Sequence, residues 1–354
     1  MTKRQLTHLA CAAAVVASGI GAAAPATAHR SVHVVRAGQS IQQAVDAAKP
    51  GDTVVVAPGT YQESVRITVP GLTLRGSGAG RTVVAPGTAT ASDACATAGN
   101  GICVAGTDAR PVRDVTVAAL TLRGFTKQGL WATRTDRLTV RAVTSERNGQ
   151  WGLATERSTR TRIVGNTVRG NGDAGVFVSN TVSAEEGALD TRGTVVARNR
   201  LSDNRIGITV RRLRNLTVER NDATGNCSAV NVVGDENTPR VGAVTVRRNH
   251  IHANNKFCPK TARLPFLQGS GIVLTGVEDV HVTRNRIEDN VGTSPFSGGI
   301  VLFKSFVGVP NDRNEIRGNV LLRNGPADLA DRDTGKANTF RGNTCRISEP
   351  AGLC

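Results

Sequence analysis

GLWATRTDRLTVRAVTSERNGQWGL, residues 129–153, spans one full period of a repeat that decides the fold of this chain. The pair that opens it, Gly followed by an apolar residue, returns 23 residues later and is spaced by 23, 23, 32, 22, 42 and 28 residues along the chain. Seven copies of the pair, one with Ala in place of Gly, begin at Gly129, Gly152, Gly175, Gly207, Ala229, Gly271 and Gly299. The minimum unit is therefore 22–23 residues, with insertions in some copies, and such a period indicates a solenoid.

Each period contains two further short elements. One alternates apolar and polar residues and ends in Arg-Asn or Gly-Asn, as LTVERN does at 216–221, and the other is short and ends in Asn, as HIHAN does at 250–254. Alternation directs apolar side chains inward and polar ones outward. Asn tolerates the left-handed backbone conformation that bends require, and stacked Asn side chains can bond one another along the axis. The pattern predicts an all-β fold, a right-handed parallel β-helix with three strands per coil, because the six-residue period of a left-handed hexapeptide helix is absent.

The first 28 residues have the pattern of a secretion signal. Lys3 and Arg4 precede an apolar run at 9–24, and Ala26-Thr27-Ala28 fits a cleavage site. No later segment approaches 18 apolar residues, so we expect a secreted, extracellular protein without a membrane span. The mature chain, 29–354, is predicted to be a single β-helix domain.

Both ends of the solenoid are predicted to be closed. Residues 40–48 are typical of a short helix with Ser40 as its N-cap, and we expect 29–60 to form an N-terminal cap and first strand. A helix there would cover the open end of the first coil, whose unpaired strands would otherwise invite aggregation. Residues 344–354 are expected to cap the last coil.

The mature chain has an even number of cysteines, so disulfides are expected in an exported protein. Six cysteines allow 15 pairings. We choose nearest-neighbour pairing, Cys95 with Cys103, Cys227 with Cys258 and Cys345 with Cys354. The second pair has further support, because both cysteines lie at the same bend of successive coils, ~4.8 Å apart. That bond is expected to hold the 255–269 loop in place.

The chain resembles secreted β-helix repeat proteins of the pectin-lyase-like superfamily. The segment from Ala37 to Tyr61 is similar to the opening of such proteins, the Arg-Asn coils resemble their repeats, and residues 325–354 are similar to a tail of exported actinobacterial members. The resemblance covers essentially the whole mature chain. It implies the β-helix fold but no single activity, since the superfamily includes polysaccharide lyases, hydrolases, epimerases, adhesins and a copper-maturation protein.

Insertions indicate which sheet carries a site. Segments 180–193, 234–242 and 304–315 follow the Gly-apolar strand, and segments 255–269 and 291–297 precede it. The sheet made of these strands, named the Gly-Ile sheet, is therefore predicted to form the floor of a groove between loops, where function usually lies.

Alternation and position select the candidate site residues. Trp131 and Phe177 are expected to face outward two coils apart, roughly 9–10 Å, a spacing suited to stacking against two sugar rings. A β-eliminating lyase needs a cation to neutralise a uronate carboxylate and a base to remove the C5 proton. The candidate catalytic residues are Glu156, Arg211, Lys260 and Arg263, and the candidate substrate-binding residues are Trp131, Trp151, Phe177, Asn231, Lys256 and Lys304.

No complete catalytic motif accompanies these residues. Residues 263–268 differ from the pectate lyase pattern R-x-P-x-x-R at Gln268, and the motifs of polygalacturonases and mannuronan epimerases are absent. His250 and His252 flank Ile251 on one strand at a metal-binding spacing. They lack an evident third ligand, so no metal site is predicted, and calcium is expected only if the protein is a lyase.

The net charge of +16, or +14 without the two basic residues of the signal, favours an acidic partner. The bias toward Arg over Lys also fits the codon usage of a GC-rich genome, which is an alternative source of this charge. We expect a protein that binds an acidic polysaccharide. The sequence leaves open whether it also cleaves that polysaccharide by β-elimination, and a non-catalytic carbohydrate-binding or surface protein is the alternative. Neither nucleic acid nor membrane is an expected partner, and the sequence leaves the oligomeric state open.

Overall fold

The computed structural model describes residues 30–87, 94–262 and 264–354 of the chain. It divides into Met1–Arg30 and Ser31–Cys354, and the second unit contains the coils. The predicted signal segment, 1–28, and the candidate catalytic Arg263 lie outside the described residues.

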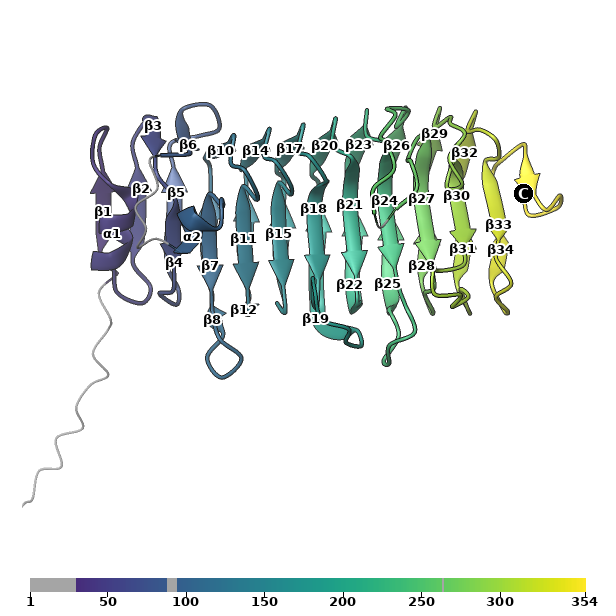
Figure 1. Ribbon diagram of the computed structural model, residues 1–354, viewed down its shortest axis with the longest axis horizontal. Helices are drawn as coiled ribbons and strands as arrows, with labels where there is room; N and C mark the ends of the chain where they lie inside the picture. The colour runs from purple at the N-terminus through teal and green to yellow at the C-terminus, as the bar shows by residue number, and fades with distance from the viewer. Residues whose placement is uncertain (1–29, 88–93, 263) are drawn as a thin grey trace, which may run out of the picture. The chain divides into compact units, whose positions relative to one another are not determined.

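The strands of Ser31–Cys354 pair in parallel and follow one another coil by coil (Figure 1). The twelve-stranded sheet consists of β1 (Val32–Val35), β2 (Thr53–Val56), β5 (Thr73–Gly76), β9 (Thr116–Ala118), β13 (Thr139–Arg141), β16 (Arg162–Val164), β19 (Leu189–Ala197), β22 (Leu213–Glu219), β25 (Gly242–Arg247), β28 (His281–Thr283), β31 (Glu315–Arg317) and β34 (Thr339–Arg341). The ten-stranded sheet consists of β3 (Gly59–Gln62), β6 (Thr82–Ala85), β10 (Thr121–Arg123), β14 (Thr144–Glu146), β17 (Thr167–Arg169), β20 (Arg200–Ser202), β23 (Asp222–Thr224), β26 (His250–His252), β29 (Arg286–Glu288) and β32 (Val320–Leu322).

The Gly-Ile sheet has eleven strands. They are β4 (Val65–Ile67), β7 (Ile102–Ala105), β11 (Leu130–Thr133), β15 (Leu153–Glu156), β18 (Ala174–Ser179), β21 (Ile206–Arg211), β24 (Ser228–Val233), β27 (Ser270–Thr275), β30 (Gly298–Phe303), β33 (Leu329–Arg332) and β35 (Ser348–Glu349). A further pair is formed by β8 (Val112–Arg113) and β12 (Thr135–Asp136). The expected three strands per coil are confirmed.

The interior is a stack of aliphatic layers. Leu130 pairs with Leu153, Leu153 with Val176 and Val176 with Ile208, and all four side chains are fully buried. Each coil adds one such layer on each sheet, which explains how a chain with 3% aromatic residues fills a core. The next residue along each strand points the other way, as the alternation predicts.

Two ladders of buried asparagines run along the bends, as predicted. The expectation that Asn itself adopts the left-handed backbone is wrong, because the positive φ falls on the residue before each Asn, as at Arg220 (φ 53°) before Asn221. In both ladders the Nδ2 of one Asn donates to the Oδ1 of the Asn one coil further on, at 2.8–3.1 Å. The members are Asn166, Asn199, Asn221, Asn249, Asn285, Asn319 and Asn343 in one ladder, and Asn148, Asn171, Asn204, Asn226, Asn254, Asn290 and Asn324 in the other. Because each amide is satisfied by its neighbour, the bends bury polar groups without leaving them unpaired.

The N-terminal helix forms where the sequence predicts it. The helix α1 (Ile41–Ala47) has Ser40 as its N-cap, whose side chain accepts a hydrogen bond from the Gln43 amide. Ile41 and Val45 are buried in the same core cluster as the coils, so α1 covers apolar side chains at this end. A second short helix, α2 (Ala94–Thr97), has no counterpart in the prediction.

The three disulfides, Cys95–Cys103, Cys227–Cys258 and Cys345–Cys354, join the expected pairs. The last one closes the tail, where Cys345 and Leu353 pack against the core. Of the helices in the described residues, none has the length and apolar character that crossing a membrane requires.

Candidate functional site

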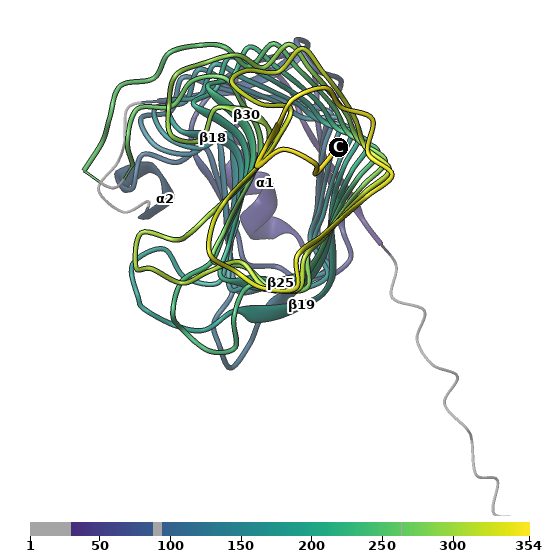
Figure 2. The same cartoon turned by 90° about the vertical axis from the view of Figure 1, so that its right-hand side faces the viewer.

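The outer face of the Gly-Ile sheet has the register that the repeat predicts. One outward row of side chains runs through consecutive paired strands as Trp131, Ala154, Phe177, Thr209, Asn231, Val273 and Val301. Two residues further along each strand, a second row runs as Thr133, Glu156, Ser179, Arg211, Val233, Thr275 and Phe303. Loops project at both edges of this sheet when the coils are viewed end on (Figure 2).

The predicted groove floor is not open to solvent at the central coils, because apolar side chains of two loops pack against it. Leu267, from the 255–269 loop, and Phe296, from the 291–297 loop, form an apolar cluster with Phe177 and Val273 of the sheet. Asn231 in the same row is 5% exposed, and its Oδ1 accepts a hydrogen bond from Ser228 Oγ at 2.5 Å. The buried surface on this side is a second core, which sequence alternation could not distinguish from a solvent-facing row.

The three candidate aromatic residues form one stack. The centroids of the Trp151 and Phe177 rings are 4.0 Å apart, and the angle between the two ring planes is 1°. The centroids of the Trp151 and Trp131 rings are 5.6 Å apart. Trp151 and Phe177 are 5% and 6% exposed, so the expectation that Phe177 offers a free face to a sugar is wrong. Trp131, at the outer end of the stack, is only partly buried, and it alone of the three presents a substantial surface to solvent.

Glu156 and Arg211 are brought to one segment of the loop that follows β18. Glu156 Oε1 accepts a hydrogen bond from the Val182 amide at 2.9 Å, and Arg211 Nη1 donates to the Val182 carbonyl at 3.3 Å. Their strands flank β18, so the two side chains lie on either side of Ser179. Both residues are only partly buried. The sequence placed them on this face correctly, but it gave no sign of their shared loop contact.

The candidate lysines of the loops make no hydrogen bond or ion pair with Glu156 or Arg211 among the described residues. Lys256 Nζ donates to the Asp203 carbonyl at 2.7 Å, while Lys260 and Lys304 are exposed on the 255–269 and 304–315 loops. The structure thus assigns Lys256 a loop-anchoring contact in addition to its predicted binding role.

Two neighbouring charged residues, the half-buried Asp173 and the buried Arg205, escaped the sequence analysis. Asp173 Oδ2 accepts a hydrogen bond from Trp151 Nε1 at 3.0 Å, and burial raises the pKa of this carboxyl despite that bond and the charge of Arg205. Arg205 is itself buried, and its Nη1 donates to the Pro259 carbonyl at 2.8 Å. Burial lowers the pKa of Arg205. The pair fixes the Trp151 ring on one side and the 255–269 loop on the other.

Ion pairs surround the end of the face near Trp131. Arg134 Nε donates to Asp108 Oδ1 at 2.7 Å, and Arg157 pairs with Glu186. The Asp108 hydrogen bond raises the pKa of Arg134, and Glu156 adds to this effect through its charge. These cations stand next to strands β11 and β15, the strands that carry Trp131 and Glu156.

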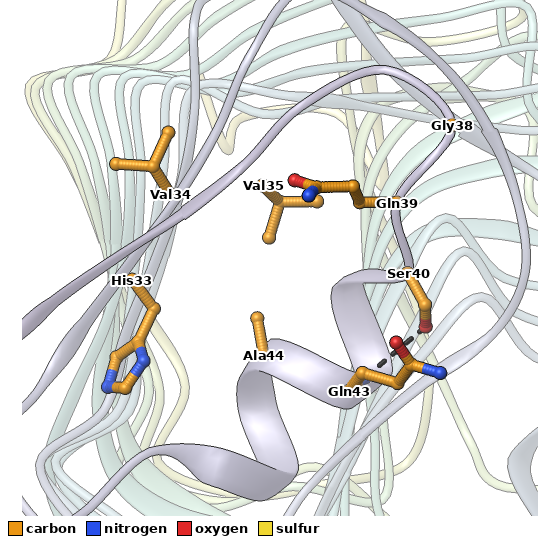
Figure 3. Close-up of a pocket in the computed structure, with 8 residues that line it drawn as sticks. All are labelled: His33, Val34, Val35, Gly38, Gln39, Ser40, Gln43 and Ala44. Atoms are coloured by element: carbon orange, nitrogen blue, oxygen red, sulfur yellow. Dashed lines mark hydrogen bonds between the residues drawn. The ribbon is translucent and has the colours of Figure 1, made fainter.

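A hollow of about 570 Å³ lies elsewhere, at the N-terminal end of the coils (Figure 3). It is lined by β1, α1 and the turn between them, with His33, Gln39 and Gln43 as its larger polar side chains. His33 Nε2 is engaged with Asp52 Oδ2 at 3.0 Å. This hollow contains none of the candidate site residues.

Comparison with known proteins identifies the handedness of the coils. Residues 87–242 match the family described as a right-handed β-helix region. The chain is a right-handed parallel β-helix. No curated protein matches it in sequence.

Solved structures share this fold at low identity. The A-module of the mannuronan C-5 epimerase AlgE4 from Azotobacter vinelandii is 18% identical, with 87% of this chain and 90% of that chain covered and a TM-score of 0.57. An alginate lyase from Paenibacillus sp. str. FPU-7 is 15% identical, with 86% and 99% covered and a TM-score of 0.52. The DFA-IIIase of Arthrobacter chlorophenolicus A6, without its lid, is 16% identical, with 87% and 82% covered and a TM-score of 0.56.

Proposed function

We propose that this protein binds an acidic polysaccharide on the outer face of the Gly-Ile sheet, in the region from β11 to β21 around the partly exposed Trp131. The single observation that carries the proposal is the partly exposed Trp131 ring, held in place by the Trp151–Phe177 stack behind it. An aromatic ring fixed in this way offers a flat apolar surface at little cost in side-chain entropy, which suits stacking on the apolar face of a sugar ring.

The electrostatics of this region favour an anionic sugar. The chain has a net charge of +16. Arg134 and Arg157 directly follow β11 and β15, and Arg211 ends β21, three strands further along the sheet than β11. A guanidinium binds a carboxylate through two parallel hydrogen bonds, so a uronate unit is a better ligand than a neutral sugar. The names of two structures of the same fold, a mannuronan epimerase and an alginate lyase, add support for a polysaccharide.

Cleavage by β-elimination is the second candidate. Glu156 and Arg211 are held by one loop on either side of Ser179. In such a reaction a base takes the C5 proton, the C5–C4 double bond forms, and the C4–O bond breaks with its electrons on the leaving oxygen. Arg211 is the cation proposed to neutralise the uronate carboxylate, and Lys260 and Arg263 remain proposed catalytic residues.

The first test measures binding and turnover together. Purified protein is titrated with polygalacturonate, alginate, hyaluronan and chondroitin, with dextran as the neutral control, while ultraviolet absorbance follows any unsaturated product with and without calcium. We expect one acidic polymer to bind, with an affinity that falls as salt is raised. Equal binding of dextran, or no binding at all, would overturn the proposal.

Single substitutions test which residues form the proposed polysaccharide-binding site. Trp131→Ala is expected to weaken binding about tenfold, the equivalent of ~1.4 kcal/mol for a lost stacking contact. Ile347→Ala, which removes an exposed apolar side chain in the C-terminal tail, is the matched control and should bind normally. If a lyase activity is found, Glu156→Ala, Arg211→Ala and Lys260→Ala should each lower it without lowering the melting temperature. Turnover that survives all three would refute the catalytic assignment.

A further inference from the structure

Three neighbouring strands of the ten-stranded sheet bring polar side chains to one outward patch. The strands β23, β26 and β29 pair in register. Asp222 and Thr224 of β23 lie opposite His250 and His252 of β26. On the other side of β26, His252 lies opposite Glu288 of β29. The middle residues Ala223, Ile251 and Ile287 are fully or almost fully buried in the core. The residues on both sides of them therefore point away from the core, and all lie on the outer face of this sheet.

Two histidine nitrogens converge on one carboxylate oxygen in this patch. Asp222 Oδ1 lies 3.2 Å from His252 Nε2 and 3.7 Å from His250 Nδ1. One ligand atom from each of the three residues lies within 4.8 Å of the others. The two imidazole rings are stacked, with centroids 4.3 Å apart. Metal bonds of 2.0–2.2 Å to such ligands place tetrahedral ligand atoms ~3.4 Å apart, so this spacing suits a shared ion.

The remaining ring nitrogens already have partners of the kind that metal-binding histidines use. His250 Nε2 lies 3.0 Å from Glu288 Oε1, and His252 Nδ1 lies 3.4 Å from Thr224 Oγ1. A neutral imidazole carries one N–H, so when His250 donates it to Glu288, its Nδ1 presents a lone pair toward the side of Asp222. Carboxylates that accept from the second nitrogen fix the tautomer and orient the ring of a ligating histidine.

Glu288 is suited to this orienting role and not to ligation. Both of its oxygens accept hydrogen bonds from the Arg286 guanidinium, at 2.8 Å each. Its charge is thereby balanced within its own strand, and Arg323 adds a second cation at 3.6 Å. The Asp222 side chain, in contrast, is 49% exposed, and the histidines are its only ion-pair partners among the described residues.

We propose that Asp222, His250 and His252 form a binding site for a divalent first-row transition metal, for which Zn²⁺ is the representative ion. Two nitrogens and one carboxylate oxygen match the ligand preference of such ions, whereas Ca²⁺ and Mg²⁺ prefer all-oxygen sites. The His250 and His252 side chains are 44% and 31% exposed, so a fourth position faces solvent and would be filled by water. This site lies on a different sheet from the proposed polysaccharide face and does not depend on it.

The sequence contained a signal for the third ligand. Asp222 follows Asn221 just as His250 follows Asn249, and Arg286 follows Asn285. Aligning these three coils places Asp222 beside His250. Along their own strand, His250 and His252 have no third ligand, whereas across the stack Asp222 lies beside them.

The test titrates metal-free protein, prepared without a polyhistidine tag, with Zn²⁺ by calorimetry in the presence and absence of excess Ca²⁺. We expect one Zn²⁺ per chain, unaffected by Ca²⁺, and an X-ray absorption spectrum with two imidazole nitrogens. Asp222→Ala, His250→Ala and His252→Ala should each weaken binding at least tenfold. Glu288→Gln should weaken it about tenfold or more through the lost orientation of His250.

The matched control is His281→Ala, which removes an exposed histidine that faces Glu315 from β28 of the twelve-stranded sheet. Its Zn²⁺ affinity should equal that of the unaltered protein. The proposal is overturned by an absence of stoichiometric binding, by unchanged affinity in His252→Ala with a normal melting temperature, or by an equal loss in His281→Ala. Trp131→Ala should bind Zn²⁺ normally, so a failed polysaccharide assay and a failed metal assay are distinguishable.

Discussion

The outer faces of the Gly-Ile sheet and of the ten-stranded sheet are built from the same repeat, yet only the first packs against loop side chains in an apolar cluster of the described residues. On the Gly-Ile sheet, outward-pointing Phe177 and Val273 belong to an apolar cluster with side chains of the 255–269 and 291–297 loops and are almost fully buried. On the ten-stranded sheet, outward-pointing Arg200 and Arg286 are exposed. The strands of both faces alternate in the same way, so what differs is whether neighbouring segments are long enough to fold back. A row of outward side chains is therefore a binding surface only where the loops leave it open.

The largest expected contrast between the two faces is in stability. Phe177→Ala removes a ring that is packed against Trp151, and we expect it to lower the free energy of unfolding by about 3–5 kcal/mol, as for a core residue. Ser202→Ala, on the outer face of the ten-stranded sheet, should change it by less than about 0.5 kcal/mol. Urea unfolding monitored by fluorescence measures both. Equal effects would mean that the loops do not form a second core.

The next contrast concerns the disulfide that holds the covering loop. Replacing Cys227 and Cys258 by Ala opens a link between residues 31 apart and should cost about 2–4 kcal/mol. Replacing Cys345 and Cys354, which are 9 apart in the tail, should cost less and is the matched control. Thermal unfolding gives the order, and limited proteolysis should cut the 255–269 loop faster only in the first variant. A reversed order would show that the loop is held by packing alone.

The smallest expected contrast is in pH dependence. Burial raises the pKa of Asp173, so the stability that its protonated form contributes is complete below the ordinary value of 3.8 and is lost as pH rises through the raised pKa. Asp52 behaves in the opposite way. Hydrogen bonds from the Lys49 amide, His33 and the Ser31 amide lower its pKa to about 2, so its contribution is present above 3.8 and is lost as pH falls toward 2.

Asn variants separate these two effects. Relative to the unaltered protein, Asp173→Asn should gain stability as pH rises above 4, and Asp52→Asn should gain stability as pH falls toward 2. Urea midpoints measured between pH 2 and 7 give both slopes. Parallel pH profiles for the two variants would contradict the assignment of one carboxyl to an apolar environment and the other to a hydrogen-bonded one.

The sequence predicted which side chains point outward from the sheet, but not which of them are accessible to solvent. The repeat placed Trp131, Glu156 and Arg211 on the outer face of the correct sheet, because strand alternation has a strict period of two. It could not show that Phe177 is covered, that Val182 joins Glu156 to Arg211, or that Asp173 holds Trp151. Each of these features depends on residues that are 22 or more positions apart in the sequence, or on the path of an inserted loop.

By itself, the sequence determined the coils of this protein, its asparagine ladders and the position of Cys227 and Cys258 at one bend of successive coils. These features depend on local alternation and on a repeat that brings like residues to the same position in every coil. The tertiary structure alone decided the second apolar core over the Gly-Ile sheet and the contact of Asp173 with Trp151. The physical reason is that the path of an inserted loop, and the contacts its side chains make with the sheet, follow from packing across coils, which no local pattern encodes.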